Sequence, residues 1–134
     1  MAIENLPAFL KEIEKAQLDV EEYALKVKKY LILKIYENLI LANPVDMGTS
    51  RFSWILSEDN PSTHKPPKAK YEKPGMPDTK MIKAYSMSFI TNNQDYIQAL
   101  EDGSSKRANA GWVESSVVRA EASIMDYING LELA

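Results

Sequence analysis

Carboxylate-bearing turns are the places in this chain where side chains could carry out chemistry. Glu101 and Asp102 are adjacent and precede Gly103. Paired carboxylates act as general acid and base when different environments separate their pKa values. Neighbouring acids before a glycine more often form a solvated turn, which is the interpretation that we adopt. Asp46 and Arg51 could form an ion pair, but a turn carboxylate beside a solvated arginine is the more ordinary arrangement.

Nucleophilic and metal-dependent chemistry has little support in the sequence. His64 is the only histidine, and no acid close in sequence is placed to orient it for a catalytic triad. The absence of cysteine removes disulfides, thiolate nucleophiles and Cys-ligated zinc. We find no phosphate-binding loop, dinucleotide fingerprint or nucleophile elbow. We therefore expect no enzymatic activity, no metal and no cofactor.

A basic segment with an aromatic residue inside it could contact nucleic acid. Its residues are Lys65, Lys68, Lys70, Tyr71 and Lys73. Aromatic residues among basic ones are typical of single-strand binding. However, acidic residues are interspersed and the whole chain has a net charge of −3, whereas nucleic-acid-binding domains are usually basic. We therefore assign these residues to a partner or intersubunit contact and keep nucleic-acid binding by Lys65–Lys73 as the alternative.

Length and composition fit one globular domain with its own core. The chain has 134 residues, of which 45% are hydrophobic and 26% are charged. No apolar run approaches the ~20 residues that cross a bilayer, and the first residues lack the features of a secretion signal. We expect a protein that is used in a cytosol, or in a particle that is assembled there.

A long helix is predicted from about Leu6 to Ala42, because apolar residues recur there at spacings of three, four and seven. Asn43-Pro44 is a stop signal, since proline pushes the preceding residue out of the helical region. A helix of ~37 residues would be ~55 Å long, which exceeds a small domain. It must therefore break near Ala16–Asp19, or protrude and need a partner.

The rest of the chain predicts an α+β domain. Residues 58–80 contain most of the prolines and should form an exposed hairpin arm between neighbouring strands. Residues 81–103 read as a strand and a corner, because Tyr85, Met87 and Phe89 alternate with polar residues. The segment from Arg51 to Leu56 fits either a strand or a helical turn. Residues 112–131 predict a C-terminal helix, and Trp54 and Trp112 are the expected buried anchors.

Three segments in a fixed order carry a family resemblance. The first is Pro44, Val45, Asp46, Met47 and Gly48, followed by Arg51, Phe52 and Trp54. The second is Asn93, Tyr96, Leu100, Glu101 and Gly103, and the third is Ala108, Asn109, Ala110, Gly111 and Trp112. They resemble the tail-completion, or head–tail joining, family of tailed bacteriophages. This chain departs from the family pattern by a methionine at position 47, the inserted Thr49-Ser50 and an asparagine at position 109.

The resemblance spans Leu6 to Leu131 and implies a non-enzymatic structural part of the phage neck. Members of the family have a small antiparallel sheet packed on helices and form rings at the junction of portal and tail. The resemblance implies a homo-oligomeric ring (hexamer or dodecamer) that contacts portal or connector proteins and tail tube or tail terminator proteins. DNA would pass through the channel without specific binding, and no membrane is involved. The protein would reside in the virion, after assembly in the host cytoplasm.

Overall fold

Two long helices and a small sheet make up the computed structural model, which describes residues 6–44, 49–67, 77–106 and 108–133. Helix α1 spans Leu6–Ala42 and α3 spans Trp112–Leu133. Strands β1 (Trp54–Glu58) and β2 (Ser88–Asn92) pair antiparallel. The shorter elements are η1 (Arg51–Ser53), η2 (Thr79–Met81) and α2 (Ile97–Glu101). The predicted α+β class is confirmed.

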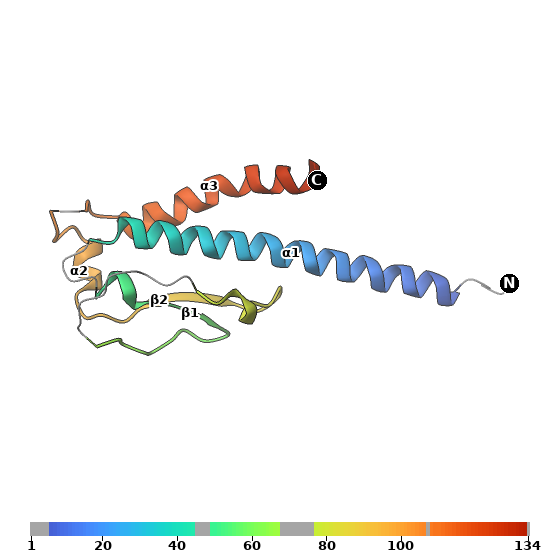
Figure 1. Cartoon of the computed structure of the whole chain (residues 1–134), viewed down its shortest axis with the longest axis horizontal. Coiled ribbons are helices and arrows are strands. Elements are labelled where there is room, and N and C mark those ends of the chain that lie inside the picture. Colours follow the sequence, from blue (N-terminus) through green and yellow to red (C-terminus); the bar gives the residue numbers. More distant parts are fainter. Residues whose placement is uncertain (1–5, 45–48, 68–76, 107, 134) are drawn as a thin grey trace.

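Helix α1 is continuous and forms the long axis of the molecule. The sheet and α3 lie on opposite sides of its C-terminal half, while its N-terminal half projects beyond both (Figure 1). No proline or glycine lies between Pro7 and Asn43, so nothing in the sequence interrupts the helical hydrogen bonds. The amide of Asn43 still donates to the carbonyl of Leu39 at 2.9 Å, and Pro44 then ends the helix. Of the two outcomes expected for this helix, the structure shows protrusion.

The two strands are joined by the proline-rich segment. Their register places Trp54 opposite Asn92 and Glu58 opposite Ser88. The chain between Glu58 and Ser88 therefore leaves one strand and returns to its direct neighbour, which confirms the hairpin arrangement of the arm. Residues 51–56 contain both of the structures that the sequence allowed, since η1 occupies Arg51–Ser53 and β1 follows from Trp54.

The prediction of a strand from Met81 onward is wrong for residues 81–87, because β2 begins only at Ser88. Ile82 is buried, whereas Tyr85 and Met87 are 74% and 68% exposed, so their alternation does not reflect one buried face. The Lys28 ammonium group donates to the carbonyl oxygens of Lys83 and Ser86. These carbonyls bind a side chain from α1 and form no strand ladder.

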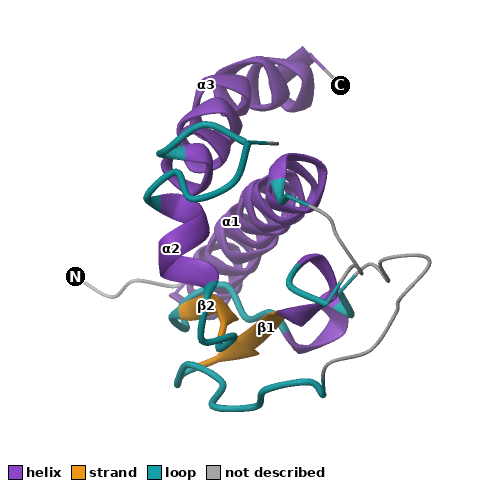
Figure 2. Ribbon diagram, turned by 90° about the vertical axis from the view of Figure 1, so that its left-hand side faces the viewer, coloured by secondary structure: helices purple, strands orange, loops and turns teal. Residues whose placement is uncertain are grey.

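Two adjoining clusters of buried side chains form the core. The larger one contains Tyr36, Leu39, Ile40, Trp54 and Trp112, and the smaller one contains Ile32, Leu56 and Ile82. An end-on view shows α1 between α3 and the sheet, which explains why α1 contributes to both clusters (Figure 2). Trp54 and Trp112 meet edge to face with ring centres 6.2 Å apart. Burial of each large apolar side chain contributes about 1.5–3 kcal/mol.

Candidate interaction surfaces

Of the two adjacent acids at the end of α2, Glu101 binds the start of the next helix and does not lie in the solvated turn that the sequence predicted, whereas Asp102 is exposed. The Glu101 carboxylate accepts hydrogen bonds from the amides of Val113 at 3.2 Å and Glu114 at 3.3 Å. Its carbonyl accepts from the amide of Gly111 at 2.8 Å. Glu101 therefore caps the N-terminus of α3, where free amides and the helix dipole favour a negative charge. Asp102 is exposed and accepts from Gln98.

The remaining residues of this corner fit the same role. Gly103 and Gly111 have φ angles of +97° and +80°, which glycine adopts without strain. A Cβ at Gly103 would also lie 3.2 Å from the Cβ of Ala110. Leu100 packs against the larger core cluster, whereas Tyr96, just before α2, is 42% exposed. The corner thus brings together Leu100, Glu101, both glycines and Trp112.

A buried polar cluster around Asn43 lies against Trp54, one member of the tryptophan pair. Asn43 accepts a hydrogen bond from Nε1 of Trp54 at 2.9 Å and donates to Oγ of Ser50 at 2.6 Å and to the carbonyl of Pro44 at 2.9 Å. Nε1 of Trp112, by contrast, is buried and has no hydrogen-bond partner among the described residues. The two indoles therefore pack together but differ in how their N–H groups are satisfied.

The predicted turn after α1 can be followed only in part. Asp46 and Gly48 lie outside the described residues, so neither the possible Asp46–Arg51 ion pair nor the more ordinary turn carboxylate that we favoured is tested. Arg51 is half-buried at the start of η1, and its Nε has no hydrogen-bond partner within the described ranges.

The first part of the proline-rich arm is bound to the turn that follows β2. The Asn93 side chain donates to the carbonyl oxygens of Ser62 and His64, each at 2.8 Å. Gln94 donates to the carbonyl of Pro66 at 2.9 Å, and Lys65 pairs with Asp95 at 2.7 Å. The segment 61–67 therefore runs along the domain, which the sequence did not indicate. Lys65 is the only predicted partner-contact residue in the described part of the arm. Lys68, Lys70, Tyr71 and Lys73 lie outside it.

An ionic cluster joins α1 to the sheet at the point where the packed half of the helix begins. Nζ of Lys28 lies 3.7 Å from the Glu58 carboxylate, which also accepts hydrogen bonds from Ser86 and Ser88. Burial of Glu58 opposes its ionisation, but the two serine hydrogen bonds and the Lys28 charge outweigh that effect and lower its pKa. Sequence reasoning missed this cluster, because its members are far apart in the chain.

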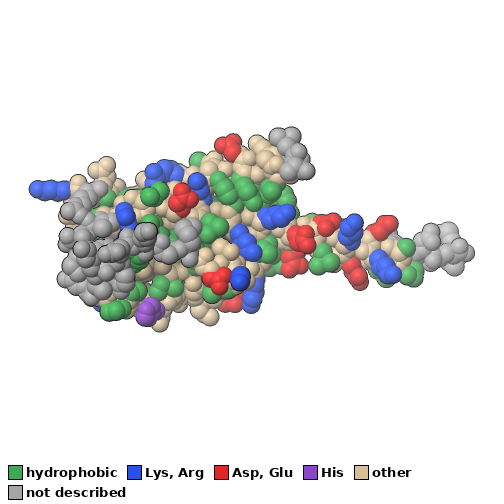
Figure 3. Space-filling view, viewed as in Figure 1, with side chains coloured by type: hydrophobic (Ala, Val, Ile, Leu, Met, Phe, Trp, Pro, Cys, Tyr) green, Lys and Arg blue, Asp and Glu red, His purple; other side chains and the backbone are tan. Residues whose placement is uncertain are grey.

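The projecting half of α1 exposes a row of large apolar side chains. Leu10, Ile13, Val20 and Tyr23 are all exposed, and Leu10 retains 49% of its accessible surface. A shallow hollow of about 310 Å³ lies on this part of the helix, lined by Ile13, Ala16, Gln17, Val20 and Tyr85. Apolar and charged side chains alternate along this projection in the space-filling view (Figure 3). The sequence analysis expected a protruding helix to need a partner, and this row is the exposed apolar surface on the part that protrudes (Figure 1).

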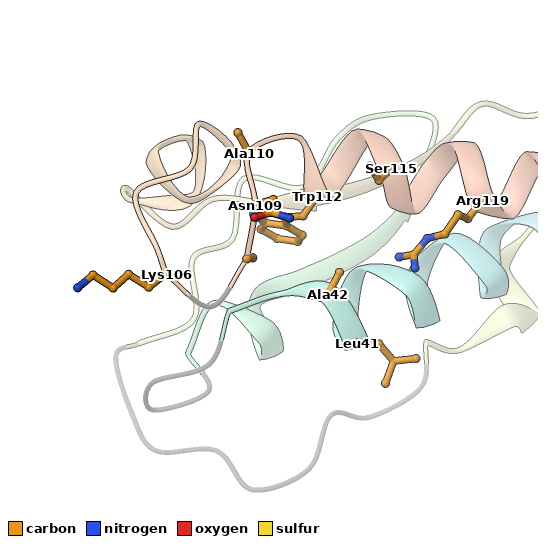
Figure 4. A pocket seen from close by; sticks show the side chains of 9 residues that line it. Leu41, Ala42, Lys106, Asn109, Ala110, Trp112, Ser115 and Arg119 are labelled. Carbon is orange, nitrogen blue, oxygen red and sulfur yellow. The ribbon is translucent and has the colours of Figure 1, made fainter.

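A second hollow lies at the opposite end of the molecule, between the C-terminus of α1 and the N-terminus of α3. Its volume is about 550 Å³, and its walls include Leu41, Ala42, Trp112, Arg119 and Lys106. The Arg119 side chain extends from α3 toward the end of α1, and Lys106 extends outward from the rim (Figure 4). Neither cation has an ion pair within the described part of the chain. The hollow therefore combines apolar walls with a positive edge.

Comparisons with protein-family models, curated proteins and solved structures returned no significant match. Within the described residues, no group of three or more His, Asp or Glu side chains could hold a metal ion. Those residues also include no helix with the length and apolarity required to span a membrane.

Proposed function

We propose that this chain is a structural subunit of the neck of a tailed bacteriophage, which forms a ring that completes the tail or joins it to the portal. The observation that carries the proposal is the apolar row on the projecting half of α1. Leu10, Ile13, Val20 and Tyr23 gain nothing from exposure to water, and the described part of the chain does not cover them. A neighbouring subunit in an assembly would bury them.

The motif residues that carry the family resemblance support an architectural role. Glu101 caps α3, Gly103 and Gly111 allow the turns that lead to it, and Trp54 and Trp112 fill the core. Each of these residues has a role in holding the fold together. A structural subunit requires no more of them than that.

A closed ring requires each subunit to present two different surfaces that complement each other. The projecting half of α1 is one candidate surface. The arm is another, because Lys68, Lys70, Tyr71 and Lys73 are proposed to contact a neighbouring subunit or a portal, connector or tail protein. Lys65 contributes less than its sequence position predicted, since Asp95 neutralises it.

Native mass spectrometry and electron microscopy of the purified chain, alone and mixed with a portal protein from the same phage, test this proposal. We expect a closed ring of fixed copy number, or such a ring on the portal. A chain that stays monomeric in both experiments would contradict the proposed function. Binding to DNA that weakens steeply with added salt, with no assembly, would favour the nucleic-acid-binding alternative.

A further inference from the structure

The apolar row on the projecting half of α1 forms a narrow stripe along one side of the helix. We define the tip stripe as Leu10, Ile13, Ala16, Gln17, Val20 and Tyr23. Their spacings of three and four residues place them on one side of the helix. From Leu10 to Val20 the stripe is ~15 Å long at 1.5 Å per residue.

Negative charges border the tip stripe on both edges. Helical spacing puts Glu14 and Glu21 along one edge, and Glu12 and Asp19 along the other. The lysines of this segment, Lys11 and Lys15, fall on the opposite side of the helix. The stripe therefore presents an apolar centre between two acidic borders, and its cations face away from any partner that it binds.

This charge pattern disfavours pairing of one tip stripe with another. If two copies met stripe to stripe, acidic borders would face acidic borders, and like charges across an interface oppose association. The complement of the stripe is an apolar surface with positive edges. Such a surface occurs on the same molecule, at the other end.

The hollow between α1 and α3 has the matching chemistry. Leu41, Ala42 and Trp112 supply apolar walls, and Arg119 and Lys106 supply positive charge, with no acid among the residues that line it. Glu37, one turn before Leu41, does not line the hollow and lies 4.0 Å from Lys34. Nε1 of Trp112 is a buried donor without a described partner, which a carboxylate or amide oxygen could satisfy.

We propose that the tip stripe of one copy seats in this hollow of a second copy. The two surfaces lie at opposite ends of the long axis, so one molecule cannot bring its own tip to its own hollow (Figure 1). The resulting contact is head to tail, which is the kind that builds rings when the rotation closes. The pairing rests on the proposed function, and it specifies which two surfaces form the ring contact.

Charge reversal in pairs tests the contact on the full chain. A tip-reversed variant carries Glu14→Lys and Glu21→Lys, and a hollow-reversed variant carries Lys106→Glu and Arg119→Glu. A matched control carries Lys11→Glu and Lys15→Glu, the same number of reversals on the back of the same helix segment. Circular dichroism checks that each variant is folded, and native mass spectrometry measures assembly.

We expect each reversed variant alone to lose the ring, with an apparent dissociation constant raised about tenfold or more. A one-to-one mixture of the two should regain it, because the reversed edge of one variant's tip then meets the reversed hollow of the other, and the unchanged tip meets the unchanged hollow. The control should assemble like the wild type.

Rings that persist in either reversed variant would overturn the pairing and leave the proposed ring function intact. The pairing is also overturned if both variants lose the ring but their mixture fails to restore it. A wild-type chain that never assembles, alone or with the portal protein, overturns both.

Discussion

The two halves of α1 share one helix and one apolar periodicity but have opposite surroundings. In the C-terminal half, Leu39 is 2% exposed and packs with both tryptophans, whereas Leu10 in the N-terminal half is 49% exposed. The difference arises because α3 and the sheet both end before the helix does (Figure 1). The periodicity of apolar residues therefore predicts that one face of the helix is buried, but the surface that buries it can belong to the same chain or to another.

The largest expected effect is a difference in stability between alanine variants of the two halves of α1. Leu39→Ala should lower the free energy of unfolding by about 2–5 kcal/mol, because it leaves a cavity in the larger core cluster. Leu10→Ala should change the stability of the dissociated monomer by no more than about 0.5 kcal/mol, because that side chain already faces water. Urea titration followed by far-ultraviolet circular dichroism measures both. Similar losses for the two variants would show that the tip is covered within one subunit.

Asn43 defines the buried end of the packed half. Asn43→Ala should cost about 2–3 kcal/mol, because it leaves the Trp54 indole N–H without its buried acceptor. Asn60→Ala is a suitable control, since Asn60 is exposed. Thermal unfolding of the two variants in parallel gives the comparison. An unaltered midpoint for the Asn43 variant would mean that water replaces the lost hydrogen bonds.

The Lys28–Glu58 cluster marks where the packed half begins, and its contribution should depend on pH. The folded-state pKa of Glu58 is lowered from the ordinary value of a glutamate. Its stabilisation is therefore complete above that ordinary value and is lost as the pH falls through the lowered pKa. Glu58→Gln should cost about 1.5 kcal/mol at neutral pH, and the difference from wild type should shrink as the medium becomes more acidic than the ordinary pKa.

Urea titrations across a pH series measure this dependence. Glu37→Gln is the matched control, because Glu37 is exposed and its partner is 4.0 Å away. If the difference in unfolding free energy between the wild type and Glu58→Gln stays constant down to the most acidic sample, the stabilisation does not come from the ionised carboxylate.

The smallest expected effect concerns the cap on α3, the helix that covers the packed half. Glu101→Ala should lower stability by about 0.5–1 kcal/mol, with Glu101→Gln in between, because the glutamine retains one oxygen as an acceptor. Faster hydrogen exchange at the amides of Val113 and Glu114 would report the loss locally. Asp102→Ala should leave both amides protected as in the wild type. If Asp102→Ala speeds hydrogen exchange at these two amides as much as Glu101→Ala does, the capping role belongs to the whole turn and not to Glu101.

Local patterns were sufficient to predict much of this fold. The spacing of apolar residues and the Asn43-Pro44 stop gave the bounds of α1 that the structure has, and side-chain type alone indicated burial of Trp54 and Trp112. The strand at residues 81–87 was mispredicted because the Lys28 side chain binds two of its carbonyls. That contact joins residues more than fifty positions apart, and no local rule reveals it.

The candidate surfaces were less predictable than the fold. Length and composition predicted a helix too long to be covered by one small domain, and an extended arm. They did not predict that residues 61–67 bind Asn93 and Gln94. The capping role of Glu101 depends on the chain turning back twelve residues later. Sequence patterns report on neighbours along the chain, whereas these contacts depend on how the elements fold back.

The placement of the two tryptophans has a spectroscopic consequence. Both lie in one cluster at the packed end, so no tryptophan reports directly on the projecting half of α1. Trp112, however, also forms a wall of the hollow, whereas Trp54 is held by Asn43. If a second copy fills the hollow as proposed, tryptophan emission should therefore change without any added label.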